Sequence, residues 1–229
     1  MTTKLLKLHD SFLPENESLH YRLEMFGAKG SVKLNWEKKG DSATLKCQAL
    51  ASLILPAKKL VDSEMVSTLQ KDGDGFWRLI KHVDSDFKTE IKRQFELKEK
   101  LIETKYIKFD EERGYLEYPE NSSVDSIFDP ILALYLLRDP VLQKENQTGL
   151  VKVLLRTGIL ELKCSLSNES PFKTLSVKVV EGQNTGVKVK EPFLSAGSQI
   201  LVDGKSGIIK EITYPLIGRF GKLTLRLQS

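Results

Sequence analysis

Regular alternation of apolar and polar residues is the feature that most constrains how this chain can fold. It runs through Leu19–Phe26, Ser31–Glu37 and Ser42–Leu50, and glycine-containing turns (AKG and KKGD) separate these stretches. Because successive side chains of a strand point to opposite faces of a sheet, a period of two predicts antiparallel strands with one packed and one solvated face.

The alternation returns along most of the chain. It predicts a strand over Phe87–Leu97, whose odd-numbered residues form the packed face, and another over Leu101–Phe109, which a DEERG turn leads back into Tyr115–Tyr118. Later strands are expected at Leu150–Arg156, Ile159–Leu166, Leu175–Val180, Val187–Lys190, Gln199–Val202, Ile208–Tyr214 and Leu223–Leu227. So many short strands predict a mainly β fold, either an antiparallel β-barrel or a strongly curved half-barrel.

One segment breaks the pattern. Phe128–Leu142 is a nearly continuous apolar run, in which Asp129 is a favourable N-cap and Pro130 suits the first helical position. Pro140 stops the run. A helix that is apolar all round is buried, so we expect one short buried helix near residues 130–138, plugging or capping the barrel.

Residues 1–17 are interpreted as an N-terminal extension and residues 18–229 as a single β-barrel-like domain. The first residues, MTTKLLKLHDSF, lack the apolar core of an intact signal peptide. They fit either a cytoplasmic protein or the mature form of an exported one. No stretch approaches the roughly 20 apolar residues of a spanning helix, so no transmembrane segment is expected.

Composition argues against several classes of function. A net charge of +4 is too small in 229 residues to indicate a nucleic-acid partner. Cys47 and Cys164 belong to no Cys/His cluster, so neither a metal site nor a cofactor is expected. Both are interpreted as buried packing residues, with a disulfide between them as the alternative.

No catalytic residue is assigned from the sequence. His9, His20 and His82 lie far apart, and no nucleophile elbow accompanies them. A Ser–His–Asp arrangement assembled from distant residues remains open. Trp36 and Trp77 are interpreted as core residues, with a stacking platform for sugar or nucleic acid as the alternative.

Tyr135 and Arg138 are the candidate ligand-binding residues. They are three positions apart, so they share one face of the expected helix. A guanidinium at the end of a buried helix needs a carboxylate, backbone carbonyls or a bound anion. Two interpretations follow. Arg138 clamps the helix to a barrel strand while Asp129 caps its start, or Tyr135 and Arg138 grip a ligand at the barrel mouth.

The run from Phe128 to Arg138 resembles the signature of the bacterial family called domain of unknown function 3108, in which a D-P-x-S-A-x-Y-x-L-R-like segment interrupts a β-rich chain. Asp129 and Pro130 are the structural signature residues in this sequence, and Leu132 stands at the usual Ser position. The strand pair Tyr21–Trp36 and the closing segment Gln199–Leu227 resemble that family's order of parts, although the family's typical late Trp is absent.

The resemblance implies a β-barrel-like envelope protein, periplasmic or associated with the outer membrane, without an established catalytic activity. Our first hypothesis is therefore a non-enzymatic envelope module that binds a lipid or other apolar ligand, or a partner protein. The second is a structural or assembly component of the envelope that holds no small molecule. The third is a hydrolase whose site is not visible in the sequence.

Overall fold

The computed structural model describes residues 3–25, 27–53, 59–98, 101–107, 111–117, 127–139, 148–155, 158–169, 172–179, 199–203, 206–215 and 222–228. Most of these residues are in strands, and a single α-helix lies among them. The expectation of a mainly β fold with one short helix is confirmed.

The elements follow one another along the chain from β1 to β17. They are β1 (Thr3–Leu5), β2 (Leu8–His9), the 3₁₀ turn η1 (Asp10–Phe12), β3 (Asn16–Met25), β4 (Ala28–Lys39), β5 (Ser42–Leu53), β6 (Lys59–Lys71), β7 (Phe76–Asp86), β8 (Ile91–Leu97), β9 (Leu101–Ile107), β10 (Glu111–Glu117), β11 (Ile127–Phe128), α1 (Pro130–Tyr135), the 3₁₀ turn η3 (Leu136–Arg138), β12 (Thr148–Leu155), β13 (Gly158–Glu169), β14 (Phe172–Val179), β15 (Gln199–Val202), β16 (Ile209–Pro215) and β17 (Lys222–Leu227).

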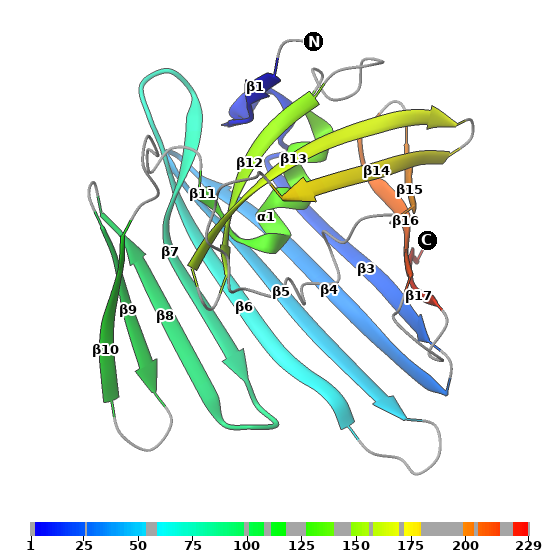
Figure 1. Cartoon of the computed structure of the whole chain (residues 1–229), viewed down its shortest axis with the longest axis horizontal. Coiled ribbons are helices and arrows are strands. Elements are labelled where there is room, and N and C mark those ends of the chain that lie inside the picture. The colour runs from blue at the N-terminus through cyan, green and yellow to red at the C-terminus, as the bar shows by residue number, and fades with distance from the viewer. Residues whose placement is uncertain are drawn as a thin grey trace.

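Hydrogen bonds join these strands into one large, strongly curved sheet. Neighbours follow in the spatial order β10-β9-β8-β7-β6-β5-β4-β3-β17-β16-β15-β14-β13-β12, and all of these pairs are antiparallel. β1 and β11 then lie along β12 as parallel neighbours. The sheet bends around α1, which lies inside the curve against β12 (Figure 1).

The core fills the inside of this curve. Buried side chains from β3, β4 and β5 meet those of α1, and every residue of α1 is buried. Trp36 and Trp77 are 1% and 0% exposed and stack edge to face, which confirms that they are core residues. The short buried helix expected near residues 130–138 is confirmed, with η3 continuing α1 to Arg138.

Residues 3–13, called the strap below, also belong to the sheet. β1 pairs with β12 in parallel, and β2 pairs with β7 in antiparallel register, so the strap links these two strands. Leu6 and Leu8 are 1% and 0% exposed. The strap therefore packs with the body that is expected from the sequence at residues 18–229.

No strand bounds are predicted from the sequence over β6 or β7, although both are long. Their paired positions Ser67 and His82 are polar yet buried, and Asp84 of β7 is buried as well. A register shift between Thr68 and Leu69 interrupts the period. Because polar residues face the core and a bulge shifts the register, the sequence of these strands lacks a clear alternation of apolar and polar residues.

The strand expected over Phe87–Leu97 begins later, at Ile91. β7 ends at Asp86, and a turn follows in which Glu90 adopts a φ of 58°. Phe87 lies in this turn and is 57% exposed, so its expected place on the packed face is wrong. The strand expected at Val187–Lys190 lies outside the described residues.

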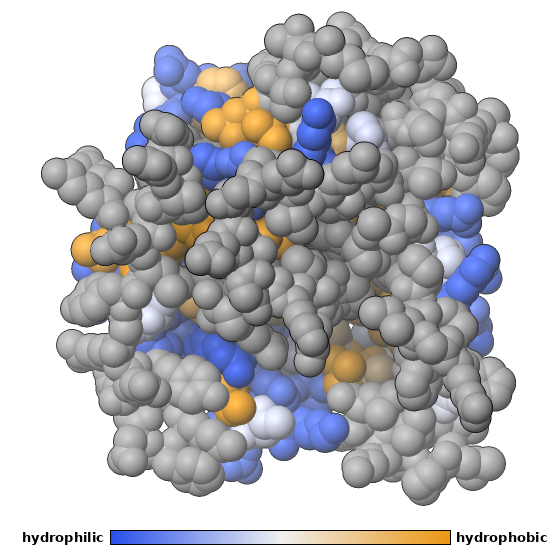
Figure 2. All heavy atoms as spheres, viewed as in Figure 1, coloured by the Kyte–Doolittle hydropathy of each residue, from blue (hydrophilic) through white to orange (hydrophobic). Residues whose placement is uncertain are grey.

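The outer surface is mixed in character. On the face shown in Figure 2, hydrophilic and hydrophobic patches of the described residues stand next to one another. Within the described part of the chain, the large hydrophobic residues that are more than a third exposed are Leu50, Val61, Ile80 and Phe87. They come from different strands and from one turn, and single exposures of this kind are ordinary on globular proteins.

Candidate functional site

The start of α1 is fixed by the buried carboxylate of Asp129. Its Oδ1 accepts the backbone N–H groups of Ile131 and Leu132 at 2.8 and 3.1 Å, and Pro130 occupies the first turn, as expected of an N-cap. Its Oδ2 accepts the hydroxyl of Ser67 on β6 at 2.7 Å. Asp129 is 0% exposed, so the helix start is tied to the sheet wall by hydrogen bonds shielded from water.

A serine, a histidine and an aspartate thus meet in the interior. His82 Nδ1 lies 2.9 Å from Ser67 Oγ and 4.0 Å from Asp129 Oδ2. The Ser67 hydroxyl donates its single proton to Asp129, and its Oγ can accept a proton from His82 Nδ1 in the tautomer that carries the proton on that nitrogen. A nucleophilic serine needs the opposite polarity, with the histidine accepting its proton. All three side chains are buried, so the cluster is suited to holding α1 rather than to attacking a substrate.

The end of the helix is fixed by Arg138 and Tyr135. The Arg138 guanidinium makes two hydrogen bonds with Glu17 of β3, Nη1 to Oε1 at 3.1 Å and Nη2 to Oε2 at 2.7 Å. The Tyr135 hydroxyl donates to Glu17 Oε2 at 3.1 Å, and the guanidinium lies 4.5 Å from the centre of the Tyr135 ring. Burial, together with the Glu17 carboxylate, raises the pKa of Tyr135 far above its ordinary value, so the phenol keeps its proton and donates it.

Both candidate ligand-binding residues therefore lie together, and their polar groups are engaged with Glu17. The clamp interpretation requires a carboxylate on a strand of the sheet as the partner of Arg138, and Glu17 of β3 provides it. The side chains of Arg138 and Glu17 are 6% and 10% exposed, which makes the pair a shielded bidentate ion pair. Glu17 is the residue that sequence reasoning missed, because nothing near position 17 indicates a partner 121 residues away.

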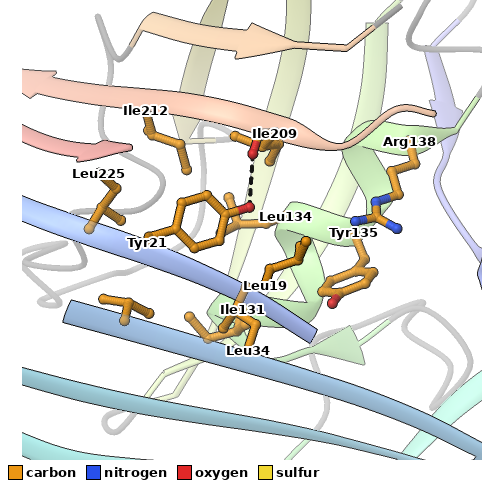
Figure 3. Close-up of a pocket in the computed structure, with 11 residues that line it drawn as sticks. Leu19, Tyr21, Leu34, Ile131, Leu134, Tyr135, Arg138, Ile209, Ile212 and Leu225 are labelled. Atoms are coloured by element: carbon orange, nitrogen blue, oxygen red, sulfur yellow. Dashed lines mark hydrogen bonds between the residues drawn. The ribbon is translucent and has the colours of Figure 1, made fainter. Parts of the chain in front are cut away.

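An apolar cavity lies beside this cluster. Figure 3 shows Tyr21 and Leu19 of β3, Leu134 of α1 and Ile209 of β16 around it, and the Tyr21 hydroxyl donates to the carbonyl of Ile209 at 2.9 Å. Its volume is about 20 Å³. That is room for roughly one water molecule, well below the several hundred Å³ of an ordinary ligand pocket.

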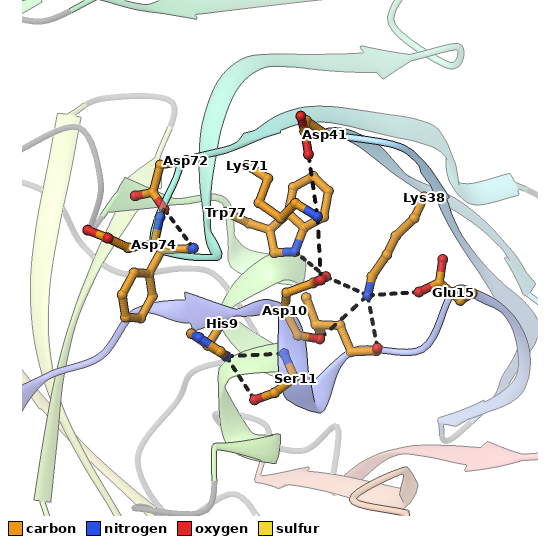
Figure 4. A network of polar contacts seen from close by, with 12 residues as sticks. His9, Asp10, Ser11, Glu15, Lys38, Asp41, Lys71, Asp72, Asp74 and Trp77 are labelled. Carbon is orange, nitrogen blue, oxygen red and sulfur yellow. Dashed lines mark hydrogen bonds and ion pairs between the residues drawn. The ribbon is translucent and has the colours of Figure 1, made fainter.

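A second polar cluster holds the strap to the end of the sheet (Figure 4). Asp10 Oδ1 accepts the indole N–H of Trp77 at 3.0 Å and contacts the Lys38 ammonium at 2.6 Å, while Asp10 Oδ2 lies 3.6 Å from Lys71 Nζ. Lys38 also donates to the carbonyl of Leu13 at 3.1 Å, and its side chain is 5% exposed. Burial raises the pKa of Asp10, but the hydrogen bonds from Lys38 and Trp77 and the charges of Lys38 and Lys71 outweigh it and lower that pKa below its ordinary value.

Neither cysteine takes part in these clusters. Cys47 and Cys164 are both free and buried, as expected of packing residues. Burial raises the pKa of each thiol to about 12, and the charge of Asp129 adds to the effect at Cys47. Both thiols therefore stay protonated at neutral pH, where a thiolate would be needed for reactivity.

Within the described ranges, no group of three or more His, Cys, Asp or Glu residues is placed to hold a metal ion. The same part of the chain contains no helix long and apolar enough to cross a membrane.

Comparison with known proteins adds one relationship of fold. No protein-family model matches this sequence, and no curated protein matches it. The structure is similar to the crystal structure of a β-barrel-like protein of domain of unknown function DUF1849 from Brucella abortus, with a TM-score of 0.56 and 10% identity over 98% of each chain. At this level of identity, the likeness concerns the fold alone.

Proposed function

We propose that this protein is a non-enzymatic module of the bacterial cell envelope that works by binding a partner protein at its surface. The observation that carries the proposal is that α1 fills the inside of the curved sheet and is locked at both ends. Asp129 holds its start to β6, and Glu17 of β3 holds its end. A cavity of about 20 Å³ leaves no room for a lipid, so binding is assigned to the outside.

The non-enzymatic part of the proposal is supported by the direction of the hydrogen bonds around Ser67. The hydroxyl donates to Asp129, and the nearby histidine is buried with it. A hydrolase site would need Ser67 to face a cleft and to give its proton to His82. The hydrolase hypothesis predicts that Ser67→Ala abolishes an esterase activity, whereas our proposal predicts only a change in stability.

The envelope location rests on the resemblance of Phe128–Arg138 to the domain of unknown function 3108 family. Cell fractionation of a tagged, natively encoded protein tests it directly. Recovery with periplasmic or outer-membrane markers supports the proposal, and recovery with cytosolic markers refutes it.

Binding of a lipid or other apolar ligand by Tyr135 and Arg138 is the second candidate. The apolar cavity next to these two residues favours it, but a ligand could enter only if α1 moved aside. Native mass spectrometry, with organic extraction, of the full chain expressed through a bacterial export pathway separates the two candidates. A clean apo mass supports surface binding. A co-purifying apolar adduct of defined mass, lost in Arg138→Met, supports the internal ligand instead.

A further inference from the structure

The strap lies in a groove that its own side chains define. Its first part, β1, pairs with β12, and the Leu6 N–H donates to Leu150 O at 2.8 Å. Its next part, β2, pairs with β7, and the Asp10 N–H donates to the carbonyl of Gly75, directly before β7, at 2.9 Å. Each of these strand pairings is only two or three residues long, so side chains supply much of the specificity.

The first specific position is a notch over Gly149 of β12. Leu6 fills it, because a Cβ at position 149 would stand only 2.5 Å from Leu6 Cδ1. Leu8, two residues on, is also fully buried and lies beside its register partner Trp77. The groove therefore accepts two apolar side chains at positions i and i+2 of an extended segment.

The second specific position is cationic. Asp10, at position i+4, is the first residue of the 3₁₀ turn η1, and it places its carboxylate against Lys38 of β4 and Lys71 of β6, with the Trp77 N–H as a third donor. Charge-assisted contacts of this kind require an acidic group on the occupant. The strap thus presents the pattern leucine, any residue, leucine, any residue, aspartate to a matching groove.

We propose that this groove is the partner-binding site of the protein, and that the strap occupies it as an internal stand-in for an extended segment of the partner. The partner segment carries two apolar residues at i and i+2 and a carboxylate at i+4. Its residues before the carboxylate pair with the edges of β12 and β7 once the strap has left, and the chain turns at the carboxylate, as the strap does at η1. This inference rests on the proposed function, since it names the site and the partner's chemistry.

A tethered strap competes strongly with any free segment. Because the strap is part of the same chain, its effective concentration at the groove is of millimolar order, so the native chain binds a free segment weakly. Leu6→Ala removes the side chain that fills the notch and leaves the groove itself unchanged. The variant chain should then bind an added copy of the strap sequence at least about tenfold more tightly than the native chain does.

The test uses full-length chains and a fluorescein-labelled peptide of residues 3–13, followed by anisotropy. We expect clear binding to the Leu6→Ala chain, about tenfold weaker binding to the native chain, and loss of binding to Leu6→Ala/Gly149→Ala, in which a methyl group fills the notch. A peptide carrying Asp10→Asn should bind the Leu6→Ala chain several-fold more weakly, and one carrying Leu8→Lys should not bind. Circular dichroism and tryptophan emission of each chain confirm that it is folded.

A folded Leu6→Ala chain that does not bind the peptide overturns the proposal, as does equal binding of the Leu8→Lys peptide. A dimer of the Leu6→Ala chain that the peptide dissociates would assign the groove to the strap of a second copy, and would also overturn it. If Leu6→Ala does not fold, hydrogen exchange on the native chain tests whether the peptide displaces the strap. Saturating peptide should expose the Leu6 and Asp10 amides of the native strap, and unchanged protection refutes the inference. Fractionation and native mass spectrometry test the proposed function without reference to this groove, so the two can fail separately.

Discussion

Gly149→Ala is the substitution that most sharply tests how the strap is held. The added methyl carbon would lie 2.5 Å from Leu6 Cδ1 and 2.6 Å from Leu6 Cγ. Carbon atoms in ordinary contact are about 3.5–4.0 Å apart, so one of the two groups must move by ~1 Å. Leu6 is 1% exposed and can yield only by leaving its notch.

The expected loss of stability follows from these contacts. Overpacking of a buried site costs about 1–3 kcal/mol, and expelling a buried leucine costs a similar amount, about 1.5–3 kcal/mol. We therefore expect the free energy of unfolding to fall by about 1–3 kcal/mol. The amides of Leu6 and Asp10, which bond to Leu150 and Gly75, should exchange faster than those of β4 and β5.

Unfolding in guanidinium chloride, followed by tryptophan emission, measures the loss of stability in Gly149→Ala. The variant Leu6→Ala tests whether the clash with Leu6 causes that loss. Alone, Leu6→Ala should cost about 2–5 kcal/mol by leaving a void. Combined with Gly149→Ala, the new methyl group occupies that void, so the double variant should lose less than the sum of the two single losses by about 0.5–3 kcal/mol. Gly73→Ala is the matched control, because nothing lies within 4 Å of a Cβ at that turn position. Additive losses, or a Gly149→Ala chain as stable as the control, would show that Leu6 does not sit in the notch as described.

Three further outcomes follow from the polar clusters. Asp129→Ala removes the N-cap and leaves the Ser67 hydroxyl and two helix amides without their hydrogen-bond acceptor. The free energy of unfolding measured in urea should therefore fall by about 2–4 kcal/mol, and a fall of less than about 0.5 kcal/mol contradicts the network. Arg138→Met leaves the Glu17 carboxylate buried without its ion-pair partner and should lower the free energy of unfolding by about 3–5 kcal/mol. The double variant Arg138→Met/Glu17→Leu should recover at least half of that loss. A double variant no more stable than Arg138→Met argues against the clamp. Since the pKa of Asp10 is lowered in the folded chain, its contribution to stability is complete above about pH 5 and is lost as the pH falls through that lowered pKa. The melting temperature of Asp10→Asn should therefore fall less steeply in acid than that of the native chain. Parallel plots of melting temperature against pH for the two chains would refute this.

Much of the fold could be predicted from local sequence. The strand predicted at Ser42–Leu50 falls within β5, and the one predicted from Leu19 coincides with β3 as far as Met25, because the period of a strand depends only on neighbouring residues. Asp129 and Pro130 likewise define the helix start through contacts within a few positions. The bounds of β6 and β7 could not be found in this way, because several of their inward residues are polar and a bulge shifts the register.

The candidate site depended far more on the tertiary structure. Tyr135 and Arg138 could be named from helix spacing, and a carboxylate could be required for the guanidinium, but Glu17 could not be chosen from the 31 acidic residues of the chain. Ser67 and His82 gave no signal that they would meet Asp129.

By itself the sequence determined where strands and helix form, since side-chain periodicity and capping act over a few residues. Only the tertiary structure decided that β1 pairs with β12 and β2 with β7, and that Glu17 meets Arg138. The reason is physical: these strand pairings and this buried ion pair join residues that are far apart in the sequence, and their free energy depends on a burial that no local stretch of sequence contains.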